Sequence, residues 1–270
     1  MQPFERLRYL ARWTDGDDGD LVGEAADCLA TFDGDPAGLV VACRRLLHHH
    51  PQAAPLWWLC ARVLAAGDPA DAAWEAWEDF GRDRTPARLA TALPFPHDAP
   101  IAILGWPYVI AAGLGERSDL DLLAVRRGDD PGLSRRLRRS VQPVRVVGDV
   151  EILALEPTHL LVEAVAAGAG RVLVPRGTDD LARAVHSHGG AVWLVVGLGC
   201  ALPERLFDAL LRECGEQATE PWDDTPETSR EVLDATFADR VLGPHGQDSP
   251  VGLARRADCP TAPELLRLGG

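Results

Sequence analysis

The sequence contains no lysine, because all 27 of its positively charged residues are arginines. Schiff-base catalysis needs a lysine amine, and a P-loop uses a lysine to reach the nucleotide phosphates, so both kinds of site are excluded. The arginines are outnumbered by 41 aspartates and glutamates, which gives a net charge of -14. Nucleic-acid binding requires a basic surface, and we therefore expect no nucleic-acid partner.

Long apolar runs and paired cysteines are also missing. No stretch reaches the roughly 18 apolar residues of a membrane-spanning helix, and the first residues, MQPFERLRYLARW, lack the apolar centre of a signal peptide. We expect a cytoplasmic protein without a membrane partner. The six cysteines show no C-x-x-C spacing, which is the spacing of a zinc site or redox motif. The adjacent histidines His48, His49 and His50 would point about 100° apart on a helix, so they cannot bind one metal ion together. We therefore predict neither a metal site nor a cofactor.

Residues 1–92 are predicted to form a helical N-terminal domain. The segment LVGEAADCLATF places its apolar residues on one helical stripe. Two further helices are expected to begin at Asp35-Pro36 and Asp68-Pro69, since aspartate is a favoured N-cap and proline suits the first helical position.

A different pattern follows the segment TALPFPHDAP, whose three prolines mark a domain boundary. Short, mostly β-branched runs alternate with helix-like stretches, which predicts a Rossmann-like parallel sheet in an α/β domain over residues 98–215. The runs are LDLLAVRRG, PVRVVGD, THLLVEA, GRVLVP and AVWLVVGLG. Residues 216–270 are expected to be a partly irregular C-terminal extension, in which REVLDATFADRVLGPHG forms a helix and a short strand.

The dipeptide Gly177-Thr178 precedes a predicted helix and has two interpretations. Its backbone N–H groups are suited to binding a phosphate at the helix N-terminus. Alternatively, Thr178 is an N-cap, and Asp179 and Asp180 in the first turn satisfy the helix dipole without a ligand. We favour the cap, because two carboxylates repel a phosphate.

Three further candidates follow predicted strands, where α/β domains place ligand-binding residues. Arg127 belongs to an arginine-rich stretch over 126–145, most of which we interpret as an exposed helix face. Asp149 is either a cleft carboxylate or the N-cap of the next helix. Glu163 is an acid at the end of a buried strand.

Several segments in this order resemble a known family. RRGDDPG at 126–132 resembles its arginine and helix-opening glycine, and QPVRVVGD at 142–149 resembles its proline, strand and aspartate. Residues 158–197 resemble its strand, glycine-alanine-aspartate, glycine-threonine turn, helix and strand. The chain is thus similar to the family of the α, β and δ subunits of eukaryotic translation initiation factor 2B and methylthioribose-1-phosphate isomerase, as a divergent prokaryotic member.

The resemblance implies the fold shared with ribose-5-phosphate isomerase and coenzyme A transferases, and dimers formed through the C-terminal domain. It places Arg127, Asp149, Gly177 and Thr178 around a ligand cleft. The related isomerases carry a catalytic cysteine after the first strand of this domain and an aspartate in glycine-alanine-aspartate. Here the first loop is LGWPYVIAAG, without cysteine, and the second motif is Glu163-Ala164-Val165.

From these departures we expect no catalytic residues. The predicted protein is a homodimeric regulatory or ligand-binding subunit that recognises a phosphorylated metabolite, and apolar segments such as GWPYVIAAG are expected to contribute to the dimer. One alternative is a sugar-phosphate isomerase-type enzyme with a rearranged active site, for instance Asp149 with Glu163. Another is a purely structural subunit.

Overall fold

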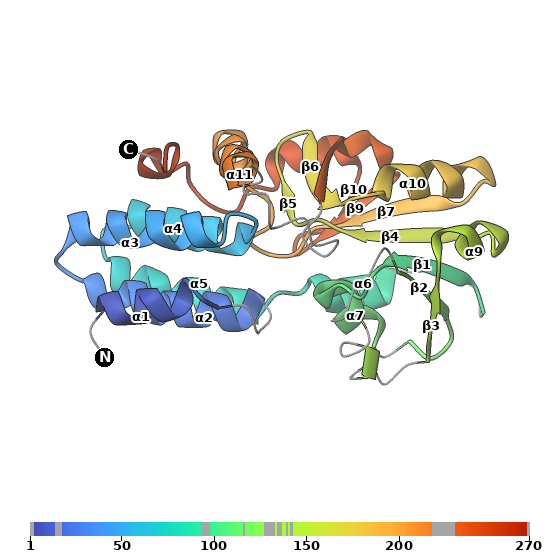
Figure 1. Cartoon of the computed structure of the whole chain (residues 1–270), viewed down its shortest axis with the longest axis horizontal. Helices are drawn as coiled ribbons and strands as arrows, with labels where there is room; N and C mark the ends of the chain where they lie inside the picture. Colours follow the sequence, from blue (N-terminus) through green and yellow to red (C-terminus); the bar gives the residue numbers. More distant parts are fainter. Residues whose placement is uncertain are drawn as a thin grey trace.

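The computed structural model describes residues 3–13, 18–92, 98–115, 117–126, 133, 137–138, 140, 143–217 and 230–268. A helical part is followed by an α/β part, and the two lie at opposite ends of an elongated molecule (Figure 1). No helix in these ranges has the length and apolarity needed to cross a membrane.

The helical part is a bundle built around buried tryptophans. Its elements are α1 (Pro3–Leu10), α2 (Asp18–Leu29), the short 3-10 helix η1 (Ala30–Phe32), α3 (Pro36–His49), α4 (Ala54–Ala65) and α5 (Pro69–Gly81). The two predicted N-caps are confirmed, because Asp35 accepts a hydrogen bond from Gly38 N at 2.9 Å and Asp68 accepts one from Asp71 N at 3.0 Å. Trp57 and Trp58 are fully buried in the bundle core.

The predicted Rossmann-like sheet is confirmed. Its strands are β1 (Pro100–Leu104), β2 (Asp121–Val125), β3 (Val144–Val147), β4 (His159–Glu163), β7 (Ala191–Val195), β9 (Arg240–Gly243) and β10 (Gly246–Asp248). The spatial order is β10-β9-β7-β4-β1-β2-β3. Neighbouring strands pair in parallel except β10, which is antiparallel to β9. The chain therefore winds outward in both directions from the β1–β4 pair.

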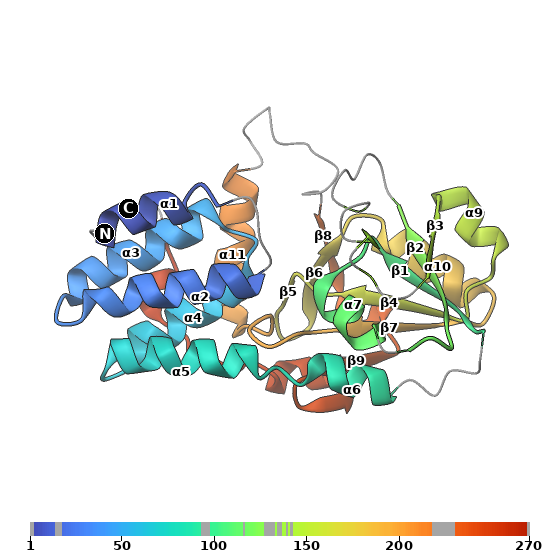
Figure 2. The same ribbon diagram turned by 90° about the horizontal axis from the view of Figure 1, so that it is seen from below.

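Helices cover both faces of this sheet. α6 (Thr85–Ala92) and α7 (Tyr108–Leu114) pack on one face, and α9 (Asp149–Ala154) and α10 (Thr178–Ser187) pack on the other. α11 (Glu204–Gln217) instead buries Phe207 in the core of the helical bundle, and Figure 2 shows it beside α3 and α4. The bundle core thus extends to α11 and to Ala166 and Leu173 of the α/β part, apart from the two apolar clusters on the faces of the sheet.

Two sequence predictions in this region were wrong. GRVLVP, expected in the parallel sheet, is β6 (Arg171–Pro175), which pairs antiparallel with β5 (Ala166–Ala167) and β8 (Arg230–Asp234). Both faces of β6 are buried, because Leu173 packs against the helical bundle and Val172 packs against the α/β core. The resulting continuous apolar run is the same pattern that a strand of a parallel sheet shows.

The segment beginning REVLD was expected to start with a helix but forms strand β8. Such a short apolar run does not separate the two structures by periodicity. The chain continues through η2 (Ala235–Phe237) into β9 and β10, so the main sheet includes strands beyond residue 215. It ends with η3 (Pro250–Arg255) and η4 (Pro263–Leu265). The division into three sequence regions stays a prediction.

Candidate functional site

The carboxyl edge of the sheet beside β1 and β4 is the candidate site. The chain leaves these adjacent strands in opposite directions, and ligands of such sheets bind in the crevice outside the strand ends at this point. After β1 the backbone turns at Gly105, where φ is 65°, and α7 begins at Tyr108. Trp106 in this loop is buried in the α/β core, whereas Tyr108 is 63% exposed.

Glu163 lies at the end of β4 and binds the start of α7. Its carboxylate accepts a hydrogen bond from Ile110 N at 2.9 Å, across 53 residues of sequence. The first N–H groups of a helix have no partner within the helix, so an acid at this place satisfies a donor and complements the helix dipole. The acid predicted from the sequence therefore lies at the carboxyl end of β4, where it is engaged by the protein's own backbone.

The Gly177-Thr178 turn opens α10, and its cap differs from the predicted one. Gly177 is the N-cap residue, with φ of 86°, and the buried Thr178 hydroxyl donates to Pro175 O at 2.6 Å. The acid at this helix start comes from β8, because Glu231 Oε1 accepts a hydrogen bond from Asp179 N at 3.0 Å. A glycine is needed here because the left-handed conformation is unfavourable for residues with a Cβ atom.

Asp149 is the first residue of α9, and the cap position is taken by Gly148. The N-cap interpretation is therefore wrong, and the side chain of Asp149 is exposed. Arg126 is exposed directly after β2, and its backbone N donates to Val147 O at the end of β3. Arg127 lies outside the described residues, so its predicted place in the cleft stays a prediction.

The predicted site residues do not form one cluster. β1 and β2 lie between Glu163 on β4 and Asp149 after β3. Three steps of about 4.8 Å between strands place their backbones roughly 14 Å apart. Gly177 and Thr178 follow a strand of the second sheet. The structure therefore gives no support to a cooperating Asp149–Glu163 pair.

Position 165, where the related isomerases have their aspartate, holds a valine that packs against the core of the helical bundle. Cys200 follows β7 at the same edge of the sheet, but it packs against the apolar α/β core. Neither residue supplies an acid or a thiol to the crevice beside β1.

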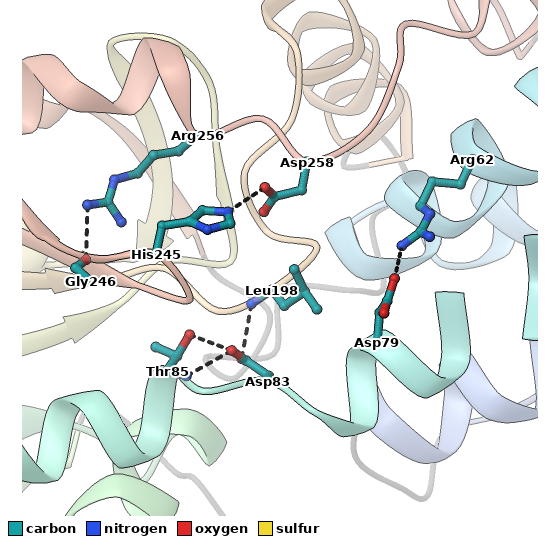
Figure 3. A network of polar contacts seen from close by, with 9 residues as sticks. All are labelled: Arg62, Asp79, Asp83, Thr85, Leu198, His245, Gly246, Arg256 and Asp258. Carbon is teal, nitrogen blue, oxygen red and sulfur yellow. Dashed lines mark hydrogen bonds and ion pairs between the residues drawn. The ribbon is translucent and has the colours of Figure 1, made fainter. Parts of the chain in front are cut away.

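Sequence reasoning missed a group of polar residues at the other end of the carboxyl edge. Asp83 accepts hydrogen bonds from Thr85 N and Thr85 Oγ1, at 2.9 and 2.6 Å, and from Leu198 N at 3.1 Å, as Figure 3 shows. It thereby fixes the start of α6 to the loop after β7. The local part of this pattern, an aspartate two residues before a threonine at a helix start, was readable in the sequence.

Arg256 was also missed, because it meets the start of β10 only through the fold. It is 8% exposed, and its Nη2 donates to Gly246 O at 3.0 Å. Burial lowers its pKa, against the opposing effect of Asp248 and Asp258. Asp258 in turn lies 2.8 Å from His245 (Figure 3).

Comparisons with known proteins identify structures with a similar fold. Neither a protein-family model nor a curated protein sequence matches the chain. The structure is similar to translation initiation factor eIF-2B from Pyrococcus horikoshii OT3, with a TM-score of 0.68 and 16% identity over 92% of this chain and 97% of that one. It is similar to the tetrameric eIF2B-beta2-delta2 complex from Chaetomium thermophilum, with a TM-score of 0.64 and 16% identity over 94% and 92%.

A third similar structure is 5-methylthioribose 1-phosphate isomerase from P. horikoshii OT3, with a TM-score of 0.62 and 15% identity over 94% of this chain and 85% of that one. These likenesses extend over nearly the whole chain, helical part and sheet together. The fold implied by the sequence resemblance is confirmed: the chain has the fold of eIF2B subunits and 5-methylthioribose-1-phosphate isomerase.

Proposed function

We propose that the protein is a non-catalytic, oligomeric regulatory or ligand-binding subunit that recognises a phosphorylated metabolite. The observation that carries the non-catalytic part is the Glu163–Ile110 hydrogen bond. Glu163, at the carboxyl end of β4, serves as a cap for α7. An isomerase must move a proton between adjacent carbons, and each positioned acid or base contributes about 100- to 10,000-fold to such a reaction.

The phosphate would be held by arginine side chains. Glu231 already occupies the start of α10, and Asp179 and Asp180 add negative charge there. Phosphate recognition therefore falls to the arginines that follow β2, of which Arg126 is exposed at the carboxyl edge. A guanidinium offers two parallel donors to phosphate oxygens.

A sugar-phosphate isomerase-type enzyme with a rearranged active site is the alternative. The observation in its favour is also Glu163, a half-buried carboxylate at the switch point of the sheet. The estimated separation of Asp149 from Glu163 speaks against that pair as acid and base. Turnover of a sugar phosphate that is lost on substitution of Glu163 would favour the enzyme.

The oligomeric part of the proposal is a homodimer. One similar structure is a tetrameric complex, and exposed apolar side chains lie at the β3 edge of the sheet: Val146 on β3, and Val150 and Leu153 on α9. In the GWPYVIAAG segment Trp106 is buried within the chain, whereas Tyr108 is exposed and available to a dimer contact. Light scattering tests the homodimer against a monomer of 29.1 kDa.

Calorimetry with a panel of sugar phosphates tests ligand recognition. Arg127→Ala should weaken binding by the loss of a charge-assisted hydrogen bond, about 2–3 kcal/mol. Arg138→Ala is the matched control, because Arg138 is an exposed arginine of the same arginine-rich stretch and should bind as the wild type does. If no compound binds, or if Arg127→Ala binds normally, the purely structural subunit replaces the ligand-binding one.

A further inference from the structure

A cavity of about 470 Å³ lies between α11 and the C-terminal segment, apart from the crevice at the sheet edge. Its lining consists of three arginines, one aspartate and one leucine: Arg205, Asp208, Arg212, Leu266 and Arg267. A cluster of three arginines is unexpected on a chain with a net charge of -14. It forms a local positive site within a negative protein.

The walls of this cavity are fixed by contacts on both sides. Arg205 and Arg212 are seven residues apart on α11, so they lie on one helix face about 10 Å apart along the axis. The opposite wall is held by Leu265, fully buried in the bundle core, and by the hydrogen bond from Arg44 Nε to Glu264 O at 2.9 Å. Arg212 Nη2 joins the walls by donating to Leu266 O at 2.7 Å.

The charges of the cavity are only partly neutralised. Asp208 is paired with Arg171 at 2.6 Å, and the same guanidinium binds Glu204. Within the described ranges, Arg205 and Arg267 form no hydrogen bond or ion pair. Both are exposed to solvent, which leaves their donors open to a ligand.

We infer that this cavity binds a small molecule that carries two anionic groups, with phosphates preferred over carboxylates. Two guanidinium groups from α11 and one from the facing segment can each donate paired hydrogen bonds to phosphate oxygens. Because the arginines are spread along two helical turns, a ligand with separated anionic groups engages more of them than a single phosphate does. The site is independent of the crevice beside Glu163 and goes beyond the function proposed above.

Calorimetry with three probes tests this inference: fructose 1,6-bisphosphate, inorganic phosphate and citrate. The bisphosphate should bind more tightly than phosphate or citrate, and its affinity should fall as ionic strength rises. The Arg205→Ala/Arg267→Ala variant should bind the bisphosphate at least about tenfold more weakly. Both residues are exposed, so the variant should fold normally.

Arg183→Ala is the matched control, because Arg183 is a 73% exposed arginine on α10. It should bind all three probes as the wild type does. Equal affinity of the double variant and the wild type for the bisphosphate would overturn the inference, and so would a wild type that binds none of the probes at about 1 mM. The same comparison is made in an Arg127→Ala background, which removes the phosphate anchor proposed for the crevice, so that the bisphosphate binding measured there belongs to this cavity.

Discussion

Replacing Glu163 by alanine tests whether this acid is a structural cap. Its carboxylate receives the Ile110 N–H at 2.9 Å in a half-buried setting. Hydrogen bonds to charged groups contribute about 1.5–3 kcal/mol, and helix caps about 0.5–2 kcal/mol. Since Glu163 is partly open to water, we expect Glu163→Ala to lower the free energy of unfolding by about 1–2 kcal/mol. Glu163→Gln keeps an oxygen acceptor and should lose about half as much.

Thermal and urea unfolding followed by circular dichroism measure this effect. A loss of this size corresponds to a fall in Tm of about 2–6 °C for a chain of this length. The matched control is Glu75→Ala, which removes an exposed glutamate of α5 and should change stability by less than about 0.5 kcal/mol. If Glu163→Ala is as stable as this control, the carboxylate is not a cap, and the argument against a catalytic role for it fails.

Two further predictions concern packing and pH. Gly168→Ala should destabilise the fold by about 1–3 kcal/mol in urea unfolding, because the added Cβ would lie 2.7 Å from the Phe207 ring and 2.5 Å from the Glu204 carboxylate. Gly170→Ala is the control and should be neutral, because the space around Gly170 is open. Equal stability of the two variants would contradict the packing described. Burial lowers the pKa of His159, against the opposing effect of Asp239. The unfolded chain therefore takes up the proton first, and stability should be lost as pH falls below about 6.5 toward the folded-state pKa. His159→Gln should reduce the difference in Tm between pH 7.5 and 5.5, and an unchanged difference would show that His159 does not cause the loss.

Local signals in the sequence predicted much of the fold. The caps at Asp35 and Asp68 were readable because an N-cap and its partner lie three residues apart. The parallel sheet was readable because strands buried on both faces form continuous apolar runs. Strand β6 shares that pattern although it lies in the antiparallel sheet, so the run alone could not assign it.

The contacts of the candidate site could not be predicted, because they join residues distant in sequence. Glu163 and Glu231 reach the helix starts across 53 and 52 residues, respectively. Which acid meets which helix depends on strand order, and apolar periodicity does not encode that order. The resemblance implied a ligand cleft, but only the structure shows that Glu163 binds the protein's own backbone.

A steady-state assay of 5-methylthioribose 1-phosphate isomerisation tests the central claim most directly. The purified chain and its Glu163→Gln variant are compared with a buffer blank, at a pH near neutrality where a carboxylate base is ionised. We expect both proteins to give the rate of the blank, because no thiol faces the crevice among the residues that the structure describes, and Glu163 serves as a helix cap. Turnover by the wild type that disappears in Glu163→Gln would contradict the account and identify Glu163 as a catalytic residue.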